Sequence, residues 1–191
     1  MNVLVTGGAG FLGSHITNLL IKEGNDVTIL DNLTKGHKDA VNPHAKLIVG
    51  DIEDPTKTKE ALKGIDAVIH MAGLIVVPES VEKPDLYAKT NVLGSINLFD
   101  CMQQEGVNKV IFSSSACVYG MPKNLPITEN EPLHPDNPYG ASKASIEAFL
   151  QAYHANFNFD VTILRYFNPY GPGELHDPET HAIPNFIKAT L

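Results

Sequence analysis

Tyr139 and Lys143 stand four residues apart in the segment NPYGASKASIEAFL, residues 137–150. On a helix this spacing puts the two side chains on one face, about one turn apart. A phenol has an ordinary pKa of about 10, so only about a thousandth of it is ionised at neutral pH. A neighbouring ammonium group lowers the pKa of a phenol because it favours the phenolate. The pair therefore predicts a tyrosine that acts as a general base towards a substrate hydroxyl.

A glycine-rich turn near the N-terminus predicts a phosphate-binding site. In VTGGAGFLGSH, Gly8, Gly10 and Gly13 match the pattern G-x-G-x-x-G, and Gly7, Gly10 and Gly13 match G-x-x-G-x-x-G. The turn lies between an apolar run and an amphipathic segment, which is the context that this motif requires. Glycines let the backbone approach a pyrophosphate, whose charge then lies at the positive N-terminus of the helix. We therefore expect a bound dinucleotide.

Asp31 indicates which dinucleotide is bound. It follows the second apolar run, DVTIL, eighteen residues after Gly13. This is near the spacing at which a carboxylate accepts hydrogen bonds from the adenosine ribose. A 2′-phosphate beside it would be repelled by about 4 kcal/mol per charge pair, at about 4 Å and an effective dielectric constant of about 20. NAD is therefore expected, although Lys35 and Lys38 offset part of this repulsion and leave NADP as an alternative.

A nicotinamide beside Tyr139 would complete the chemistry. Tyr139 would take the proton of a substrate alcohol while the carbinol hydride passes to the nicotinamide. Bringing the phenol from a pKa of about 10 to about 7 needs about 4 kcal/mol, which Lys143 and the cationic nicotinamide are expected to supply. Ser113, Ser114 and Ser115 end the run VNKVIFSSS, where one hydroxyl can hold the same substrate oxygen. The residues alone do not decide which serine does so.

The elements that must position these residues alternate along the chain. Short β-branched runs alternate with helix-period segments, and the runs are apolar throughout, as in strands buried on both faces. The expected strands are NVLVT, DVTIL, AKLIVGDI, DAVIHMA, VNKVIFSSS and FDVTILRYF. This order predicts an α/β fold with a doubly wound parallel sheet and helices on both faces. Prolines make residues 121–138 a loop that leads into the Tyr139 helix.

With these motifs in place, the sequence resembles the extended short-chain dehydrogenase/reductase family, and most closely its UDP-galactose 4-epimerase branch. The resemblance runs from Asn2 to about Gly173. Its motifs are TGGAGFLGSH, DNLT, GDI, HMAG, TNVLGSINL, SSSACVYG, PYGASK and LRYFNPYGPG. It implies a Rossmann-like domain that binds NAD, and epimerisation at C4 of a UDP-sugar by transient oxidation to a 4-keto sugar.

The resemblance also implies roles for individual residues. Catalysis would fall to Tyr139, Lys143 and Ser115, with Ser115 preferred to Ser114 on the family pattern alone. The cofactor-binding residues would be Gly7, Gly10, Phe11, Leu12, Gly13, Asp31, Asn32, Asp51, Ile52, Ala72, Gly73, Asn91, Tyr139, Lys143 and Phe167. Of these, Asp51 and Ile52 would contact the adenine and Phe167 the nicotinamide side. The substrate-binding residues would be Ser115, Tyr139 and Asn168.

Three departures from the family pattern bear on the expected reaction. Ala116 and Cys117 stand where sugar-nucleotide dehydratases carry an Asp-Glu pair, which argues against dehydration. Ile75 stands where many epimerases have a lysine. The chain is also shorter than members of the family. We therefore expect residues 1–166 to form the NAD-binding domain and residues 167–191 to begin the substrate-binding region, with the smaller C-terminal substrate domain largely missing.

Two alternative functions stay open. The first is another nucleotide-sugar enzyme of the same family, such as a 4-epimerase for uronic or N-acetylated sugars, or a decarboxylase. The second is an NAD-binding module without turnover, because most sugar contacts are expected beyond the cofactor half.

Composition limits the partners and the compartment. The 191 residues are 43% hydrophobic and 19% charged, with a formal net charge of −8 and scattered basic residues, so nucleic-acid binding is not expected. The apolar runs are too short to span a membrane, and the N-terminus has no signal-peptide pattern. Cys101 and Cys117 give no disulfide framework, which suits the cytoplasm. His176 and His181 match no metal-ligand spacing, so no metal is expected.

An apolar stripe on the Tyr139 helix predicts an interface. It consists of Ile146, Phe149, Leu150 and Tyr153, away from the Tyr139 and Lys143 pair. Such a stripe packs either in the core or against a partner. Because members of the family commonly dimerise through this helix and the long one before it, we expect a homodimer through the helix pair that includes residues 139–153.

Overall fold

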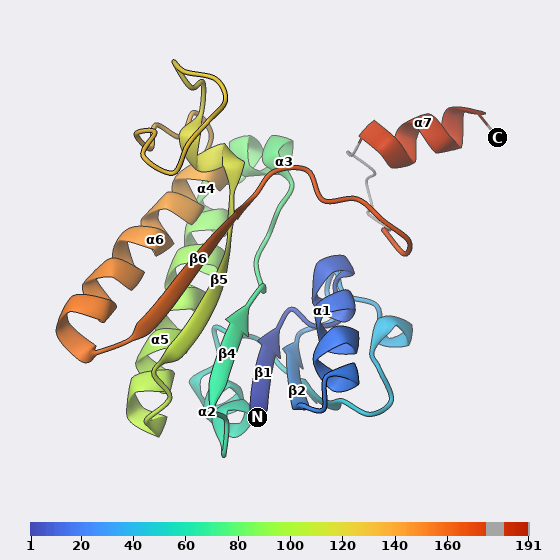
Figure 1. Cartoon of the computed structure of the whole chain (residues 1–191), viewed down its shortest axis with the longest axis vertical. Coiled ribbons are helices and arrows are strands. Elements are labelled where there is room, and N and C mark those ends of the chain that lie inside the picture. Colours follow the sequence, from blue (N-terminus) through green and yellow to red (C-terminus); the bar gives the residue numbers. More distant parts are fainter. Residues whose placement is uncertain (175–181, 191) are drawn as a thin grey trace.

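Six parallel strands form one twisted sheet in this computed structural model, which describes residues 1–174 and 182–190. The strand order is β3-β2-β1-β4-β5-β6 (Figure 1). The strands are β1 (Asn2–Thr6), β2 (Asp26–Asp31), β3 (Lys46–Val49), β4 (Ala67–His70), β5 (Lys109–Ser115) and β6 (Asp160–Tyr166). All six lie within the runs expected from the sequence or extend them by one residue. The predicted doubly wound α/β fold is confirmed.

Helices connect the strands and cover the sheet. The α-helices are α1 (Phe11–Lys22), α2 (Pro55–Leu62), α3 (Val77–Glu82), α4 (Pro84–Tyr87), α5 (Gly94–Glu105), α6 (Pro138–Phe157) and α7 (Ala182–Thr190). Two short 3₁₀ turns, η1 (Lys38–Ala40) and η3 (Ala116–Tyr119), and one π-helix, η2 (Ala88–Leu93), complete the described elements. None of the helices in the described part of the chain is both long and apolar enough to cross a membrane.

The two faces of the sheet carry different helices. Successive strand residues point to opposite faces, so Leu4 belongs to one apolar cluster while Val3 and Val5 belong to another. The larger cluster packs β1, β4 and β5 against α2, α5 and α6, and the smaller one packs β1 and β2 against α1. Figure 1 shows α1 on one side of the sheet and α5 and α6 on the other.

The order of the strands reverses between β1 and β4. The chain winds from β1 outwards to β3 and then crosses back to β4, so the connections after β1 and β4 turn away in opposite directions at the carboxyl ends of these strands. Ligands of such sheets bind at this reversal. The glycine turn follows β1 and Ala72 follows β4, so both lie at the reversal.

Helix α6 begins and ends as its sequence requires. Pro138 is its first residue, and the Asn137 side chain accepts a hydrogen bond from Gly140 N at 2.8 Å. Asn158 ends it in the left-handed conformation. Residues 121–137 contain neither helix nor strand, as expected. The apolar stripe is divided, because Ile146, Leu150 and Tyr153 are buried in the core of the chain itself and only Phe149 is exposed.

Candidate functional site

The glycine turn is packed so closely that side chains would not fit. Gly7 has a φ of +72°, and a Cβ there would lie 2.7 Å from Ala72 N. A Cβ on Gly13 would overlap the Gly7 carbonyl. Gly10 is the N-cap of α1 and provides no side-chain hydrogen bond to the first turn. The turn that leads into the N-terminus of α1 therefore carries no side chain larger than the buried Ala9 methyl, which fits a pyrophosphate.

Asp31 ends β2 beside this turn and is 7% exposed. Its two carboxylate oxygens accept hydrogen bonds from Ala9 N at 3.0 Å and from Leu33 N at 2.9 Å. Each oxygen retains a second lone pair, so the carboxylate can still accept from a ribose hydroxyl. Next to it, Asn32 Nδ2 donates to Asp51 Oδ2 at 2.7 Å, which joins two more predicted cofactor residues.

Asn91 holds the segment that follows β4. Its Oδ1 accepts from Leu74 N at 2.8 Å, and its Nδ2 donates to the Leu74 carbonyl and to Ser142 Oγ, both at 3.0 Å. Gly73 has a φ of +154°, and a Cβ there would lie 3.0 Å from Asn91 Oδ1 and 3.8 Å from Lys143 Nζ. The π-helix η2 therefore brings Asn91 between the β4 end and α6, in agreement with the enrichment of π-turns at functional sites.

The three predicted catalytic residues meet at the carboxyl ends of β4 and β5. Tyr139 is 9% exposed, and its hydroxyl interacts with the Ser115 side chain. Lys143, one turn further along α6, donates from Nζ to the Ser113 carbonyl at 2.9 Å and lies 6.0 Å from the centre of the Tyr139 ring. The Tyr87 ring meets the Tyr139 ring edge-on at 6.4 Å. Strand β5 and the helices α4 and α6 thus meet at one phenol.

The electrostatics of this group differ from the expectation. Burial raises the pKa of Tyr139 above its usual value, and the interaction with the Ser115 side chain only partly counteracts this. Burial also lowers the pKa of Lys143 to about 8, so its ammonium form is destabilised. The described residues therefore do not bring the phenol towards neutrality by themselves. The sequence led us to expect help from Lys143, but desolvation of both groups opposes that effect.

The structure separates the three strand-end serines. Ser113 provides a backbone carbonyl to Lys143. Ser114 points to the α6 face and donates to Glu147 Oε1 at 2.5 Å. Ser115 is 8% exposed and lies with Tyr139. Glu147 lies about two turns after Tyr139 on α6, so the two adjacent hydroxyls meet different parts of the same helix.

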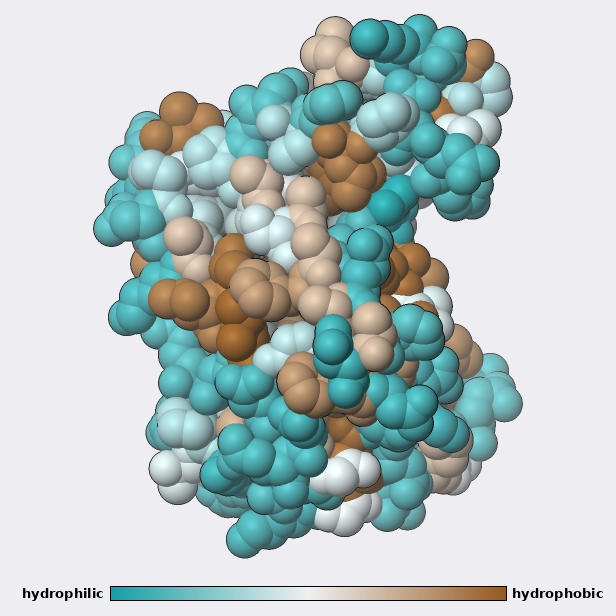
Figure 2. All heavy atoms as spheres, turned by 90° about the vertical axis from the view of Figure 1, so that its left-hand side faces the viewer, coloured by the Kyte–Doolittle hydropathy of each residue, from teal (hydrophilic) through white to brown (hydrophobic). Residues whose placement is uncertain are grey.

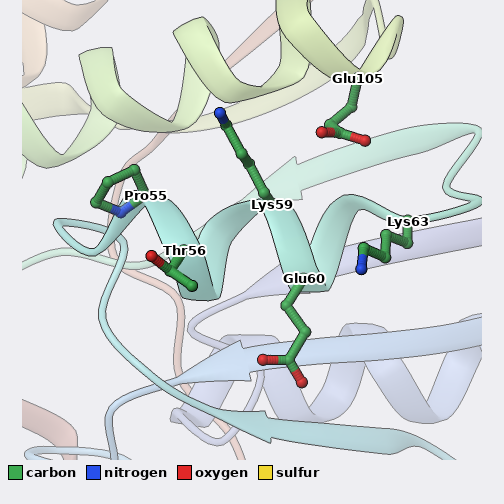
Figure 3. A pocket seen from close by; sticks show the side chains of 6 residues that line it. All are labelled: Pro55, Thr56, Lys59, Glu60, Lys63 and Glu105. Carbon is green, nitrogen blue, oxygen red and sulfur yellow. The ribbon is translucent and has the colours of Figure 1, made fainter.

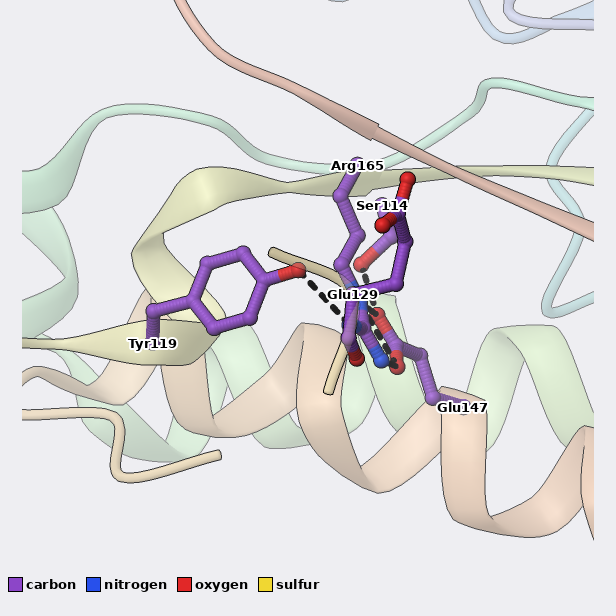
Figure 4. Close-up of polar contacts among 5 residues, drawn as sticks. All are labelled: Ser114, Tyr119, Glu129, Glu147 and Arg165. Atoms are coloured by element: carbon purple, nitrogen blue, oxygen red, sulfur yellow. Dashed lines mark hydrogen bonds and ion pairs between the residues drawn. The ribbon is translucent and has the colours of Figure 1, made fainter. Parts of the chain in front are cut away.

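The buried Glu147 and the half-buried Arg165 form an ion pair that was not predicted from the sequence (Figure 4). Arg165 Nε donates to Glu147 Oε1 at 3.0 Å and Nη2 to Oε2 at 2.7 Å. Arg165 Nη1 also donates to the Tyr119 hydroxyl at 2.8 Å and to the Glu129 carbonyl at 3.4 Å. The available signal was an arginine inside an apolar strand, because a buried charge requires a partner.

Some predicted residues lie apart from this group. The side chain of Ile52 is buried in the larger core cluster, so only its backbone can face an adenine. Phe167 and Asn168 follow β6 and are exposed. Phe11 and Leu12 occupy the first turn of α1. The chain after β6 passes over the carboxyl end of the sheet to α1, where the Pro172 carbonyl lies 2.8 Å from His15 Nε2.

A hollow of the described surface lies elsewhere. It has a volume of about 590 Å³ between α2 and the end of α5, and is lined by Pro55, Thr56, Lys59, Glu60, Lys63 and Glu105 (Figure 3). None of these is a predicted site residue, and the hollow carries both charges rather than a converging set. In residues 1–174 and 182–190, no three His, Cys, Asp or Glu side chains are grouped as metal ligands. His176 and His181 lie outside the described residues.

Comparison with known proteins gives consistent matches. The chain matches the family described as NAD dependent epimerase/dehydratase over residues 3–191. It is 48% identical to a UDP-glucose 4-epimerase from Lactobacillus helveticus over 199 residues, which covers 100% of this chain and 60% of that protein.

Two solved structures are closely similar in fold. UDP-glucose 4-epimerase from Brucella ovis in complex with NAD has a TM-score of 0.94 and 43% identity, covering 96% of this chain and 59% of that one. UDP-N-acetylglucosamine 4-epimerase from Methanobrevibacter ruminantium M1, in complex with UDP-N-acetylmuramic acid, has a TM-score of 0.92 and 42% identity, covering 99% and 62%. The chain thus spans about 60% of the length of these relatives.

Proposed function

The chain belongs to the NAD dependent epimerase/dehydratase family, and on this basis we propose that the complete protein uses NAD to interconvert UDP-glucose and UDP-galactose. The relatives named above that act on UDP-glucose support this substrate. Residues 1–166 are proposed to hold the cofactor, and residues 167–191 to begin the substrate-binding region.

Several residues of the chain would hold the cofactor. The glycine turn would receive the pyrophosphate, and Asp31 would accept hydrogen bonds from the adenosine ribose. Asn32, Asp51 and the Ile52 backbone would face the adenine side. Bound NAD would supply the hydride acceptor and donor for C4 of the sugar.

Proton transfer would fall to Tyr139. Its phenolate would take the proton of the sugar 4-hydroxyl, and the phenol would return that proton once the hydride reaches the other face of the 4-keto sugar. Ser115 would hold the same substrate oxygen, and Lys143 would favour the phenolate. Phe167 and Asn168 would contact the nicotinamide side and the sugar, respectively. The observation that carries this proposal is the convergence of Ser115, Tyr139 and Lys143 beside Gly73 and the glycine turn.

Dinucleotide choice tests the cofactor assignment. We expect the chain to bind NAD more tightly than NADP, because Asp31 would repel a 2′-phosphate. Calorimetric titration of the chain with each dinucleotide measures both dissociation constants. Equal or tighter binding of NADP would contradict the role of Asp31.

A different nucleotide sugar is the second candidate. The similarity to a UDP-N-acetylglucosamine 4-epimerase at 42% identity favours an N-acetylated substrate as the alternative. Turnover of the complete protein with UDP-galactose and with UDP-N-acetylgalactosamine, compared as kcat/KM, separates the two. If neither sugar is turned over, a uronate 4-epimerase, a decarboxylase or an NAD-binding module without turnover remains.

A homodimer through α5 and α6 is also proposed for the complete protein. The elements on this side leave four apolar side chains exposed, Val81, Leu93, Phe149 and Phe157. Figure 2, turned so that the side of α6 faces the reader, shows apolar surface gathered there. Light scattering of the complete protein, with and without Phe149→Glu, tests the dimer.

The two unpaired cysteines suit a reducing compartment such as the cytoplasm.

A further inference from the structure

A hydrogen-bonded chain of buried side chains joins β1 to α5 beneath the candidate site. Thr6, His70 and Ser95 are each 0% exposed. Thr6 Oγ1 lies 2.7 Å from His70 Nδ1, and His70 Nε2 lies 2.8 Å from Ser95 Oγ. The Ser95 hydroxyl also makes a short hydrogen bond to the Asn91 carbonyl. None of these three side chains was a predicted site residue.

The hydrogen bonds at each end of this chain of side chains determine which atom donates in every bond between them. The Asn91 carbonyl can only accept, so the single hydroxyl proton of Ser95 is donated to it. Ser95 Oγ must then accept from His70, which places a proton on Nε2. At the other end, Thr6 Oγ1 accepts from the backbone N–H groups of Met71 and Ala72, both at 3.2 Å. The Thr6 hydroxyl proton is therefore donated to His70 Nδ1.

The reverse direction leaves donors without acceptors. If His70 carried its proton on Nδ1, that proton would point at Thr6 Oγ1, and the Thr6 hydroxyl would lose its acceptor. A buried donor without an acceptor is costly. The surroundings also disfavour an imidazolium ion, because Phe99 and Phe112 enclose the ring at 5.9 and 5.6 Å between centres. Burial, followed by the charge of Lys143, lowers the pKa of His70 to about 3.

The two ends of this chain hold the same backbone segment. Thr6 binds Met71 and Ala72, at the start of the segment that follows β4. Asn91 binds Leu74, at its end, through both atoms of its amide. His70 joins the two supports. A shift of Ala72 would also reach the glycine turn, because Gly7 packs directly against the Ala72 backbone.

We propose that His70 is a positioning residue, fixed as the neutral Nε2–H tautomer, which holds residues 71–74 and Asn91 in place for the dinucleotide. The ligand in this inference rests on the proposed function. The tautomer does not rest on the proposed function, because it follows from hydrogen bonds within the protein alone. Two measurements therefore test the inference separately.

The first measurement is the tautomer. Long-range proton–nitrogen correlation spectra of the chain with labelled histidine report which ring nitrogen carries the proton, and the signal that disappears in His70→Gln identifies the residue. We expect Nε2 protonated and Nδ1 unprotonated at pH 7. A proton on Nδ1, or on both nitrogens, would overturn the inference.

The second measurement is dinucleotide affinity in matched threonine variants. Thr6→Val keeps the shape but removes the hydroxyl, so we expect the NAD dissociation constant to rise by about tenfold. Thr6→Ser restores the hydroxyl and should restore the affinity. Thr17→Val is the control, because Thr17 is equally buried and its hydroxyl has no hydrogen-bond partner within the described residues. Unchanged affinity in Thr6→Val would overturn the positioning role.

Ser95→Ala covers the case in which Thr6→Val does not fold. It removes the acceptor of the His70 Nε2–H, so weaker NAD binding and a shifted Nε2–H signal are expected, and wild-type values for both would overturn the inference. If the unmodified chain bound no NAD at all, the proposed function would fail, and with it the positioning role. The tautomer would still decide whether the hydrogen-bonded chain exists.

Discussion

Tyr139 is the residue on which the proposed chemistry depends. Tyr139→Phe keeps the ring that packs against Tyr87 and removes only the hydroxyl. In the complete protein we expect turnover to fall by about 10² to 10⁴, the usual contribution of a general base, while NAD binding stays nearly unchanged. Initial rates with UDP-galactose and calorimetry with NAD measure the two effects. An active Tyr139→Phe enzyme would mean that another group takes the proton.

The adjacent serines provide a second test at the residue scale. Ser114 is tied to Glu147 on the α6 face, whereas Ser115 lies with Tyr139. Ser115→Ala should lower kcat by about 10² to 10³, because it would remove the proposed hydrogen bond to the reacting oxygen. Ser114→Ala should change kcat little and act mainly on stability, by about 1 to 3 kcal/mol, since it leaves Glu147 with one donor fewer. Equal kcat losses in the two variants would contradict this division.

His70 makes the free energy of unfolding depend on pH. The folded chain keeps His70 neutral down to a pKa of about 3, against 6.5 for an ordinary histidine. The unfolded chain therefore binds more protons between these values, and the stabilising contribution, complete above about pH 6.5, is lost as pH falls towards 3. The site can contribute at most about 1.4 kcal/mol per pH unit.

Urea unfolding at pH 7.5, 6 and 5 measures this slope. His70→Gln lacks the titrating group, so the difference in the free energy of unfolding between wild type and variant should narrow as pH falls. His154→Gln is the control, because His154 is exposed in the last turn of α6, where its ring makes a hydrogen bond with the Phe159 carbonyl. A difference that does not change with pH would show that His70 is not held neutral.

At the scale of elements, the Glu147–Arg165 pair fixes α6 against β5 and β6. Ser114 and Arg165 are opposite each other in the sheet, and Glu147 lies one turn after Lys143 on the helix. The pair therefore holds the helix that carries Tyr139 in register with the strand that carries Ser115. Glu147 is 1% exposed, so its removal would leave the guanidinium of Arg165 without its main partner.

Glu147→Ala is expected to lower the free energy of unfolding by about 3 to 5 kcal/mol, as for other broken buried pairs. Glu60→Ala breaks the exposed pair with Lys57 and should have almost no effect. The double variant Glu147→Leu with Arg165→Met should recover part of the stability, because it leaves no buried charge. Denaturant unfolding of the three variants measures this. A Glu147→Ala variant as stable as Glu60→Ala would contradict a stabilising role of the Glu147–Arg165 pair.

The sequence predicted elements better than it predicted contacts between them. The strands were recognisable because strands buried on both faces read as continuous apolar runs, and Tyr139 and Lys143 because their spacing matches one helical turn. The Glu147–Arg165 pair joins a helix to a strand 18 residues away, and no local pattern reports such a pair. The π-helix that aims Asn91 has no compositional signature either. The pKa of Tyr139 could not be predicted from the sequence, because it depends on burial, which only the packed structure provides.

At the scale of the whole molecule, the described chain contains the proposed cofactor side and little of a substrate side. The glycine turn, Asp31 and α6 lie within the six-stranded sheet and its connections. Beyond it, α7 stands apart from the sheet in Figure 1, and its Ile183, Phe186 and Ile187 are 42%, 70% and 55% exposed. Apolar exposure of this kind favours association with another surface. We therefore expect cofactor binding and substrate turnover to be separable in this chain.

We predict that the 191-residue chain alone binds NAD but has no measurable epimerase activity. It spans about 60% of the length of its relatives, and we expect most contacts to the uridine diphosphate and the hexose to lie in the remainder. Without them the sugar C4 is not held near the nicotinamide, and orientation of this kind can contribute roughly 7 to 11 kcal/mol of barrier reduction. Incubation of the chain with NAD and UDP-galactose, followed by chromatography for UDP-glucose, measures turnover. A rate close to that of a full-length relative would require a complete substrate site within these residues.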